Sequence, residues 1–263
     1  MSRLLGISRS IVYYQRTPIS HDTSLENLIN QIFNDSRKVY GSRKIKKVLE
    51  RRGLLVSRRK IQRIMKKYKL ESKYTLKQYK RTESGSNESE VGNVLDRQFS
   101  ERKPLEVIVS DLTYVRVLNR WGYVCLIIDL FNREIVGHSC GYHKNAELVE
   151  EAFVSTGYDL SQVDLFHSDR GKEYDNALIA EFLSVHGIER SLSNKGCPYD
   201  NAVAEATYNI FKIEFCYKRV FTSLEELKLE LFDYVNWYNN VRIHGSLGYL
   251  TPVEYKSVHI NSV

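Results

Sequence analysis

Three consecutive runs with the pattern of β-strands, between residues 105 and 141, constrain the fold of this chain most. Leu105 to Val117 alternates apolar and polar residues and is rich in Val. Gly122 to Leu130 and Arg133 to Gly141 follow it, and a short turn at Phe131 and Asn132 joins these two. The sequence therefore predicts a three-stranded meander.

The region that follows mixes helices with strands. Ala146 to Ser155 has a helical pattern, and Val163 to Phe166 is a short apolar strand. Tyr174 to Val185 is again helical, with Gly187 as its stop. We therefore expect an α/β fold in which the short strand leads directly into Asp169, because open α/β sheets usually place their sites at strand ends of this kind.

Three carboxylates stand where such a fold would place a site. Asp111 lies near the end of the first strand in VSDLTY, Asp169 lies in HSDRG, and Glu205 follows 36 positions later in YDNAVAE. Transfer of a phosphodiester needs an activated attacking oxygen and a neutralised leaving oxygen, and two divalent ions about 4 Å apart can provide both. Hard oxygen ligands hold such ions, so we expect two Mg²⁺ or Mn²⁺ ions. One acid alone is more often a cap or a solvated terminus, but three in this order favour a metal-dependent phosphoryl-transfer site.

Glu205 lies on a predicted helix that begins after Gly196 and Pro198. Asp200 and Asn201 supply N-cap chemistry, and no helix breaker follows before residue 215. Seven residues make almost two helical turns, so side chains spaced three, four and seven positions after Glu205 lie on the same face of the helix as Glu205. A cation on that face could meet a phosphate, although a solvated helix lysine is the alternative interpretation. The residues of this face are Glu205, Tyr208, Asn209 and Lys212.

With these motifs the chain resembles the DDE transposases of bacterial insertion sequences, a family related to retroviral integrases. Within that family it resembles the downstream reading-frame (frame B) product of two-frame elements. The resemblance spans nearly the whole chain. The matching segments are Asp111 with Thr113 and Tyr114, Ile127 to Gly137, HSDRG with Tyr174, Ser193 to Glu205, Lys212 with Glu214, and Trp237 to Tyr255.

The resemblance implies a ribonuclease H-like core with a mixed five-stranded sheet and helices. It also implies a catalytic, metal-binding triad at Asp111, Asp169 and Glu205, with Lys212 as an assisting residue. The chain departs from the family pattern at four positions, and none of them is a predicted metal ligand. These positions are Ile108 for a usual Trp, Glu173 for Gln, Ala206 for Ser and Ile243 for Pro.

Positive charge is concentrated in one window of 45 residues, Arg37 to Arg81. The window holds 19 Lys and Arg residues against two Glu, a net of +17, and because the whole chain carries +7 the remainder carries −10. This asymmetry predicts a module that binds a polyanion, attached to a more acidic catalytic body. We therefore expect double-stranded DNA as the partner, both element ends and target.

Apolar residues at helical spacing show that the window is more than a disordered basic tail. Two stripes are present, Ile45 with Val48 and Leu49, and Ile61 with Ile64, Met65 and Tyr68. With Ser42 and Ser57 as N-caps, the pattern predicts an all-α helix-turn-helix region in which Ser57 to Lys67 enters a groove.

Eight side chains are predicted to contact DNA. Arginine and glutamine can read base edges, but contact with phosphate is the commoner fate of an exposed basic residue. Arg242 comes from the aromatic segment Trp237 to Tyr255, for which a structural flap closing the core is the alternative. The predicted residues are Arg43, Lys44, Arg58, Arg59, Gln62, Arg63, Lys66 and Arg242.

The predicted organisation is a partial helix-turn-helix at 1–19, a basic DNA-binding domain at 20–81, a linker at 82–103, the core at 104–220, and a C-terminal helix and flap at 221–263. In the first segment Gly6 predicts a turn and Ser8 a helix cap, and the helix expected before them would need residues upstream of Met1. The resemblance offers a cause, since frame-B products are commonly fused to an upstream frame. We expect this upstream reading-frame protein as fusion or partner, and a homo-oligomer on DNA.

Several classes of protein are excluded by what the chain lacks. No segment has the apolar length of a membrane span, the N-terminus has no signal-peptide pattern, and no nucleotide fingerprint is present. The four cysteines have no C-x-x-C spacing and predict free thiols, so we expect a cytoplasmic, nucleoid-associated protein. Two other functions remain open, a catalytically decayed DNA-binding regulator and a ribonuclease H-type nuclease acting on RNA paired to DNA.

Overall fold

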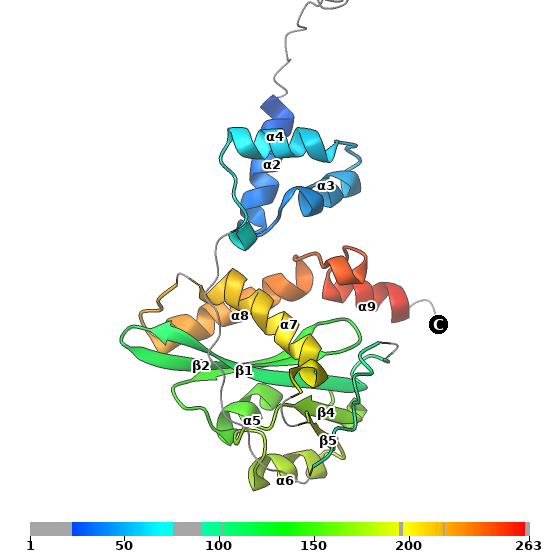
Figure 1. Ribbon diagram of the computed structural model, residues 1–263, viewed down its shortest axis with the longest axis vertical. Coiled ribbons are helices and arrows are strands. Elements are labelled where there is room, and N and C mark those ends of the chain that lie inside the picture. Colours follow the sequence, from blue (N-terminus) through cyan, green and yellow to red (C-terminus); the bar gives the residue numbers. More distant parts are fainter. Residues whose placement is uncertain (1–22, 76–90, 101, 195–196, 218, 261–263) are drawn as a thin grey trace, which may run out of the picture.

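The computed structural model describes residues 23–75, 91–100, 102–194, 197–217 and 219–260. These residues form a small helical domain that stands on a larger α/β domain (Figure 1). The predicted partial helix-turn-helix at 1–19 and residues 82–90 of the predicted linker lie outside the described residues. Within the described ranges, no helix is long and apolar enough to cross a membrane. The four cysteines are free, as predicted.

The helical domain consists of α2 (Thr23–Asp35), α3 (Ser42–Arg51) and α4 (Arg58–Lys67). Each helix contributes a completely buried isoleucine to its centre, namely Ile29, Ile45 and Ile61. The start of α4 is as predicted, because the Ser57 hydroxyl accepts a hydrogen bond from the Lys60 N–H at 3.2 Å. Ser42 was predicted as the N-cap of α3. This prediction is wrong, because Gly41 occupies the N-cap position and Ser42 is the first helical residue.

The α/β domain is built on a five-stranded sheet with the strand order β3-β2-β1-β4-β5. Its strands are β1 (Val107–Val117), β2 (Arg120–Asp129), β3 (Ile135–Gly141), β4 (Leu165–Ser168) and β5 (Glu189–Leu192). The first three strands pair antiparallel, which confirms the predicted meander, and β4 and β5 run parallel to β1. This mixed sheet is the one expected of a ribonuclease H-like core.

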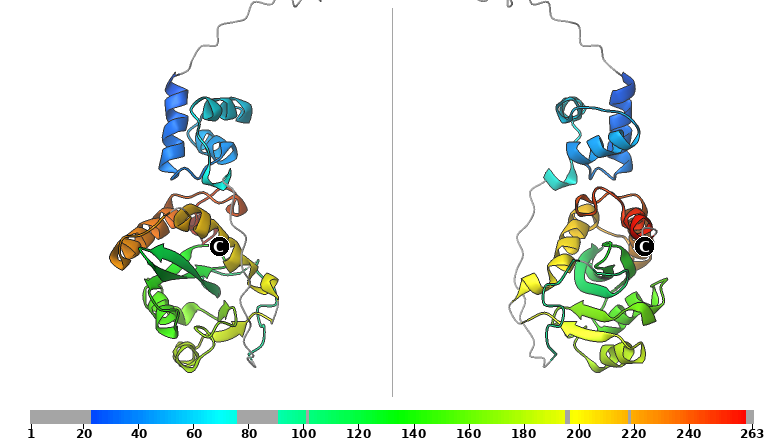
Figure 2. Two further views of the ribbon diagram at one scale, coloured as in Figure 1. Left: turned by 60° about the vertical axis from the view of Figure 1, so that its left-hand side comes forward. Right: turned by 90° about the vertical axis from the view of Figure 1, so that its right-hand side faces the viewer.

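Different helices cover the two faces of the sheet (Figure 2). The helices are α5 (Ala146–Val154) and α6 (Ala177–Val185) on one face, and α7 (Ala202–Phe211) and α8 (Leu224–Asn240) on the other. Alternate residues of β1 belong to the two apolar cores, with Val107 and Val109 on the α7 side and Ile108 on the α5 side. The sheet is therefore buried on both faces, which keeps the strands that carry the predicted acids rigid.

The C-terminal part is more helical than predicted. Helix α8 ends at Asn240, and a second helix, α9 (Pro252–Ile260), follows within the segment for which one helix and a flap were predicted. Thr251 and Glu254 form a reciprocal capping box at the start of α9, at 3.1 and 2.8 Å. Helix α6 also starts later than predicted, after Asn176 as its N-cap. The short turns are η1 (Lys73–Thr75), η2 (Leu160–Gln162), η3 (Pro198–Asn201), the π-helical η4 (Lys212–Cys216) and η5 (Gly245–Leu247).

Gly137 in β3 packs against α5 without room for a side chain. A Cβ at this position would clash with the Ala152 carbonyl oxygen and lie 2.8 Å from Thr156 Cγ2. We expect Gly137→Ala to lower the free energy of unfolding by about 1 to 3 kcal/mol, because backbone atoms cannot move aside as a flexible side chain does. Gly157→Ala, with nothing within 4 Å of the added Cβ, is the control and should change it by about 0.5 kcal/mol or less. Urea unfolding measures both, and equal midpoints would contradict this packing.

Candidate active site

Asp111 and Asp169 lie on neighbouring parallel strands at the same level of the sheet. The register of β1 and β4 pairs Val109 with His167, and each acid is two residues further along. Strand β4 ends at Ser168, so Asp169 is the first residue beyond it. Pairing within the sheet therefore places these two acids next to each other.

Each of the two carboxylates is engaged by a backbone amide close to it in the sequence. Asp111 Oδ1 accepts a hydrogen bond from the Leu112 N–H at 2.8 Å, and Asp169 Oδ1 accepts one from the Gly171 N–H at 3.0 Å. Asp111 is 8% exposed and Asp169 is half-buried. Because one oxygen of each carboxylate is fixed, the direction of the other is restricted.

Glu205 is brought to these acids because α7 is tied to β1. Asn201 Nδ2 donates to the Ser110 carbonyl at 3.2 Å, and the Tyr208 hydroxyl donates to the Asp111 carbonyl. Asn201, Glu205 and Tyr208 follow one another at intervals of four and three residues, so they share a helix face. Glu205 therefore lies between two residues that bind β1 at and next to Asp111. Asn201 occupies the N-cap position of α7 as predicted, but its side chain makes no capping hydrogen bond to the helix.

Lys212 stands one turn beyond Tyr208 and caps the C-terminus of α7. It is half-buried, and its carbonyl accepts a hydrogen bond from the Tyr217 N–H at 2.8 Å as the chain passes through η4. Helix α7 thus carries Glu205 in its first turns and Lys212 at its end, on the same face.

The donor chemistry of the three predicted ligands fits a divalent metal ion, since all three are carboxylates. Within the parts of the chain that the structure describes, however, no three His, Cys, Asp or Glu side chains are gathered closely enough to hold one. The backbone brings the acids to one region, but their carboxylates do not converge on a common point. Carboxylates repel one another, and a bound cation would offset that repulsion.

A lysine that the sequence motifs did not indicate lies within electrostatic range of Asp111 and Asp169. Lys144, between β3 and α5, forms an ion pair with Glu173 at 2.7 Å. Burial acts to lower the pKa of Lys144, but Glu173, and then the charges of Asp169 and Asp111, outweigh it and raise that pKa. The site therefore contains a cation of its own. The signal in the sequence was Glu173, a charged residue where the family usually has glutamine.

His167, which precedes the second acid by two residues, has a structural role. Its Nδ1 is hydrogen bonded to the Ser191 hydroxyl at 2.8 Å and its Nε2 to the Ser193 hydroxyl at 3.1 Å. Burial lowers the pKa of His167 to about 4, so the ring is neutral at physiological pH. Both ring nitrogens link β4 to β5 and the residues after it, which leaves the imidazole no part in proton transfer.

Most of the predicted DNA-contacting side chains are exposed. Figure 1 shows α4 on the part of the helical domain that points away from the sheet. Its opposite face, with Ile61, Ile64 and Met65, is buried in the helical domain. Arg43 at the start of α3 is exposed as well. The exposed residues on α4 are Arg58, Arg59, Gln62, Arg63 and Lys66.

Arg242 and Lys44 do not share this exposure. Arg242 is 2% exposed and pairs with Glu214 at 2.8 Å, so the predicted DNA contact through Arg242 is wrong, because a phosphate cannot reach a buried guanidinium. For Arg242, the alternative prediction that Trp237 to Tyr255 has a structural role is the one that agrees with the structure. Lys44 Nζ lies 5.1 Å from the centre of the Tyr40 ring. Burial, followed by the charge of Arg242, lowers the pKa of Lys44 to about 7.

Known protein families match both parts of the chain. Residues 20–78 match the HTH-like domain, and residues 101–198 and 205–260 match two models of the integrase core domain. The transposase for insertion sequence element IS904 of Lactococcus lactis is 31% identical over 88% of this chain and 93% of its own length. A protein of insertion sequence element IS150 of Escherichia coli is 32% identical over 97% of this chain and 92% of its own length. The chain belongs to the DDE transposases of bacterial insertion sequences.

Among solved structures, the transposase is similar to the catalytic core domain of HTLV-2 integrase in complex with magnesium. The TM-score is 0.43 with 14% identity, covering 58% of this chain and 97% of that chain. The first integrase core match includes Asp111 and Asp169, and the second begins at Glu205. Family membership and the mixed sheet together confirm the predicted ribonuclease H-like fold.

Lys44 and its sequence neighbour Arg43 provide a matched test of the DNA-contacting surface. The pKa of Lys44 is lowered from 10.5 to about 7 in the folded transposase. The contribution of Lys44 to the free energy of unfolding therefore rises as the pH increases from about 7 to 10.5. We expect Lys44→Met to raise Tm most below about pH 7, with the gain vanishing by about pH 10.5. Its DNA affinity should stay within about twofold of wild type, whereas Arg43→Met should weaken binding. Equal losses of affinity in the two variants, measured by fluorescence anisotropy, would contradict the placement of Lys44.

Proposed function

We propose that Asp111, Asp169 and Glu205 are the catalytic, metal-binding acids with which this transposase cuts DNA at the ends of its element and joins the freed 3′-hydroxyl to target DNA. The observation that carries this assignment is the attachment of α7 to β1. Two side chains, one from the N-cap residue of α7 and one from the helix itself, stand on either side of Glu205 and bind consecutive carbonyls of β1. The second carbonyl belongs to Asp111. Such an attachment holds the third acid at the level of the first.

Two divalent ions, Mg²⁺ or Mn²⁺, are the cofactor that suits this set of hard donors. When bound, they supply an activated attacking oxygen and a neutralised leaving oxygen. Asp111 and Asp169 would hold them from the sheet, while Glu205 would hold them from the helix. The backbone amides that fix one oxygen of each aspartate limit the reorientation that binding requires.

Two lysines are proposed to position DNA at the acids. Lys212 shares a face of α7 with Glu205 and would meet a phosphate beyond the acids. Lys144 stands beside Asp169 and is held by Glu173, so it would offset the negative charge of an incoming phosphate. Neither lysine is assigned a proton transfer.

DNA is proposed to lie along the exposed basic face of α4, in a domain comprising residues 20–81. The proposed core, 104–220, and its C-terminal helix and flap, 221–263, would receive the scissile phosphate. An upstream reading-frame segment would add recognition of the element ends. Because two ends and a target must meet in one complex, several copies would act together on DNA within the nucleoid.

Replacing each proposed acid by its amide tests the assignment. Asp111→Asn, Asp169→Asn and Glu205→Gln each remove a charged ligand with little change in volume, so cleavage and joining should fall below about a hundredth of wild type. DNA affinity should be nearly unchanged, because α4 lies elsewhere. Lys212→Ala should cause a milder loss. The assay uses labelled element-end DNA with Mg²⁺ or Mn²⁺.

Asp164→Asn is the matched control, since Asp164 is exposed just before β4. Any acid whose amide variant keeps more than a few per cent of the cleavage does not belong to the site. The same assay distinguishes the two other functions, because a decayed regulator binds this DNA without cutting it and a ribonuclease H-type nuclease cuts only RNA paired to DNA.

Neutralising the α4 face tests the proposed DNA contact. The combined change of Arg58, Arg59, Arg63 and Lys66 to Gln should weaken binding and flatten the plot of log affinity against log salt by about 0.9 for each phosphate that the variant no longer neutralises. Lys228→Gln, an exposed charge on α8, should leave the slope unchanged. An unchanged slope in the α4 variant would show that these side chains do not face phosphate.

A further inference from the structure

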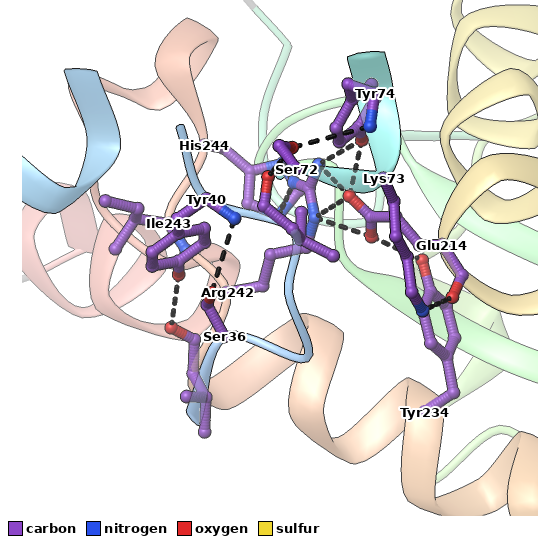
Figure 3. A network of polar contacts seen from close by, with 12 residues as sticks. Ser36, Tyr40, Ser72, Lys73, Tyr74, Glu214, Tyr234, Arg242, Ile243 and His244 are labelled. Carbon is purple, nitrogen blue, oxygen red and sulfur yellow. Dashed lines mark hydrogen bonds and ion pairs between the residues drawn. The ribbon is translucent and has the colours of Figure 1, made fainter. Parts of the chain in front are cut away.

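Glu214, in η4, is buried between the helical domain and the α/β domain and accepts several hydrogen bonds. It is 3% exposed, and Arg242 donates to both of its oxygens from Nε at 2.9 Å and to one of them from Nη2 at 2.8 Å. The hydroxyls of Tyr74 and Tyr234 donate to the same carboxylate, the latter at 3.0 Å. Burial raises the pKa of both phenols, so they remain donors. Figure 3 shows this group, the Glu214 hub, defined by these four residues.

Two loops of the helical domain reach the hub and its surroundings. Tyr74 belongs to η1, and its neighbour Lys73 donates from Nζ to the Glu214 carbonyl at 2.7 Å. Tyr40, between α2 and α3, accepts a hydrogen bond from the Ile243 N–H at 2.9 Å (Figure 3). One apolar cluster also includes residues of the helical domain together with residues of α7 and α8. The helical domain is therefore docked on the core through buried contacts.

The outer contacts of the same interface are weaker than the hub. Arg37 pairs with Asp233 of α8 at 2.8 Å, and Arg51 pairs with Glu254 of α9 at 3.2 Å, but these pairs are partly exposed. Solvent and salt screen such pairs, whereas a buried carboxylate that loses its partners is strongly destabilised. The hub is therefore the contact that determines how the helical domain sits.

A single helical run connects the hub to the active site. Glu205 lies in α7 and Glu214 lies in η4, which continues α7 without a break. The step of nine positions from Glu205 to Glu214 corresponds to roughly 14 Å of helix. Because the first part of this run is tied to β1 and the last part to the helical domain, the distance from the docked domain to the third acid is set by a rigid element.

We propose that Glu214 and Arg242 are positioning residues, which fix the helical domain relative to the three acids so that DNA held by α4 presents one defined phosphate for cutting. This inference rests on the functions proposed above for α4 and for the acids. A domain that was merely tethered would raise the local concentration of DNA but would not select the position of the cut. A docked domain selects the position of the cut, because it holds the DNA at a fixed distance from the three acids.

Tyr74→Phe tests the hub, with Tyr68→Phe as the matched control. Tyr68 also donates to a carboxylate, that of Glu26, at 2.5 Å, but this bond lies within the helical domain. The two tyrosines are 37% and 38% exposed. Each variant thus loses one hydrogen bond between a phenol and a carboxylate, and only in Tyr74→Phe does this bond join the two domains. Tyr74→Phe also loses the hydrogen bond that the Tyr74 hydroxyl accepts from Arg242 Nη2 at 3.2 Å, which joins the two domains as well. Glu214 keeps Arg242 and Tyr234 as donors, so the fold should be retained.

The full-length variants are compared on end-labelled element-end DNA with Mn²⁺, and the cuts are mapped to single nucleotides. Tyr74→Phe should spread the cuts over neighbouring phosphates and slow the main cut about tenfold, with the DNA affinity and its salt slope within about twofold. Tyr68→Phe should keep both position and rate. Identical cutting patterns and rates in the two variants would overturn the inference.

Hydrogen exchange of the free proteins supplies a readout that needs neither DNA nor metal. Tyr74→Phe should speed amide exchange in η1 and η4 together, because the two turns separate, whereas Tyr68→Phe should affect only the helical domain. Unchanged exchange in η4 of the Tyr74 variant would also overturn the inference. Cutting by the wild type tests the proposed function, and only the difference between the two variants tests the hub, so a failure of one is distinguished from a failure of the other.

Discussion

The attachment of α7 to β1 is the interaction on which the rest of the candidate active site depends. Asp111 and Leu126 are register partners in β1 and β2, and the Tyr208 hydroxyl binds both, donating to the carbonyl of one and accepting from the N–H of the other at 2.5 Å. Burial raises the pKa of this phenol, so it stays protonated and keeps both bonds. A buried phenol bound to two strands fixes the rotation of its helix, and the direction of Glu205 follows from that rotation.

The fold was predictable from the sequence where the information is local. The alternation in Leu105 to Val117 has the period of a half-buried strand, and the short turn that follows the second run permits a meander, which the structure confirms. The cap at Ser57 was also readable from local chemistry. Helix α9 was missed although Thr251, Pro252 and Glu254 carry the pattern of a capping box with proline at the first helical position.

The parts of the site that were missed depend on partners far away in the sequence. Arg242 has the composition of a DNA contact, but its carboxylate partner is 28 positions upstream and buried with it. Asn201 has the chemistry of a helix cap, yet its side chain binds a carbonyl 91 positions away. Lys144 lies in no motif and acquires its place only when β3 and the loop carrying Glu173 meet. A sequence pattern indicates which side chains are able to bind, while the tertiary fold determines which partner they find.

The contact between the two domains includes the π-helical turn at Lys212–Cys216, and deletion of a single residue would change this turn. A π-turn holds one residue more than an α-turn of the same span. Loss of one residue from this turn would restore regular α-helix, so that side chains inside the turn would change direction while the chain after it would keep roughly its place relative to α7. Glu214 would then leave Arg242, while Glu205, earlier in the run, would stay in place. Relatives that differ by one residue in this turn could therefore share the same chemistry and cut their DNA at different distances from the sequence they hold.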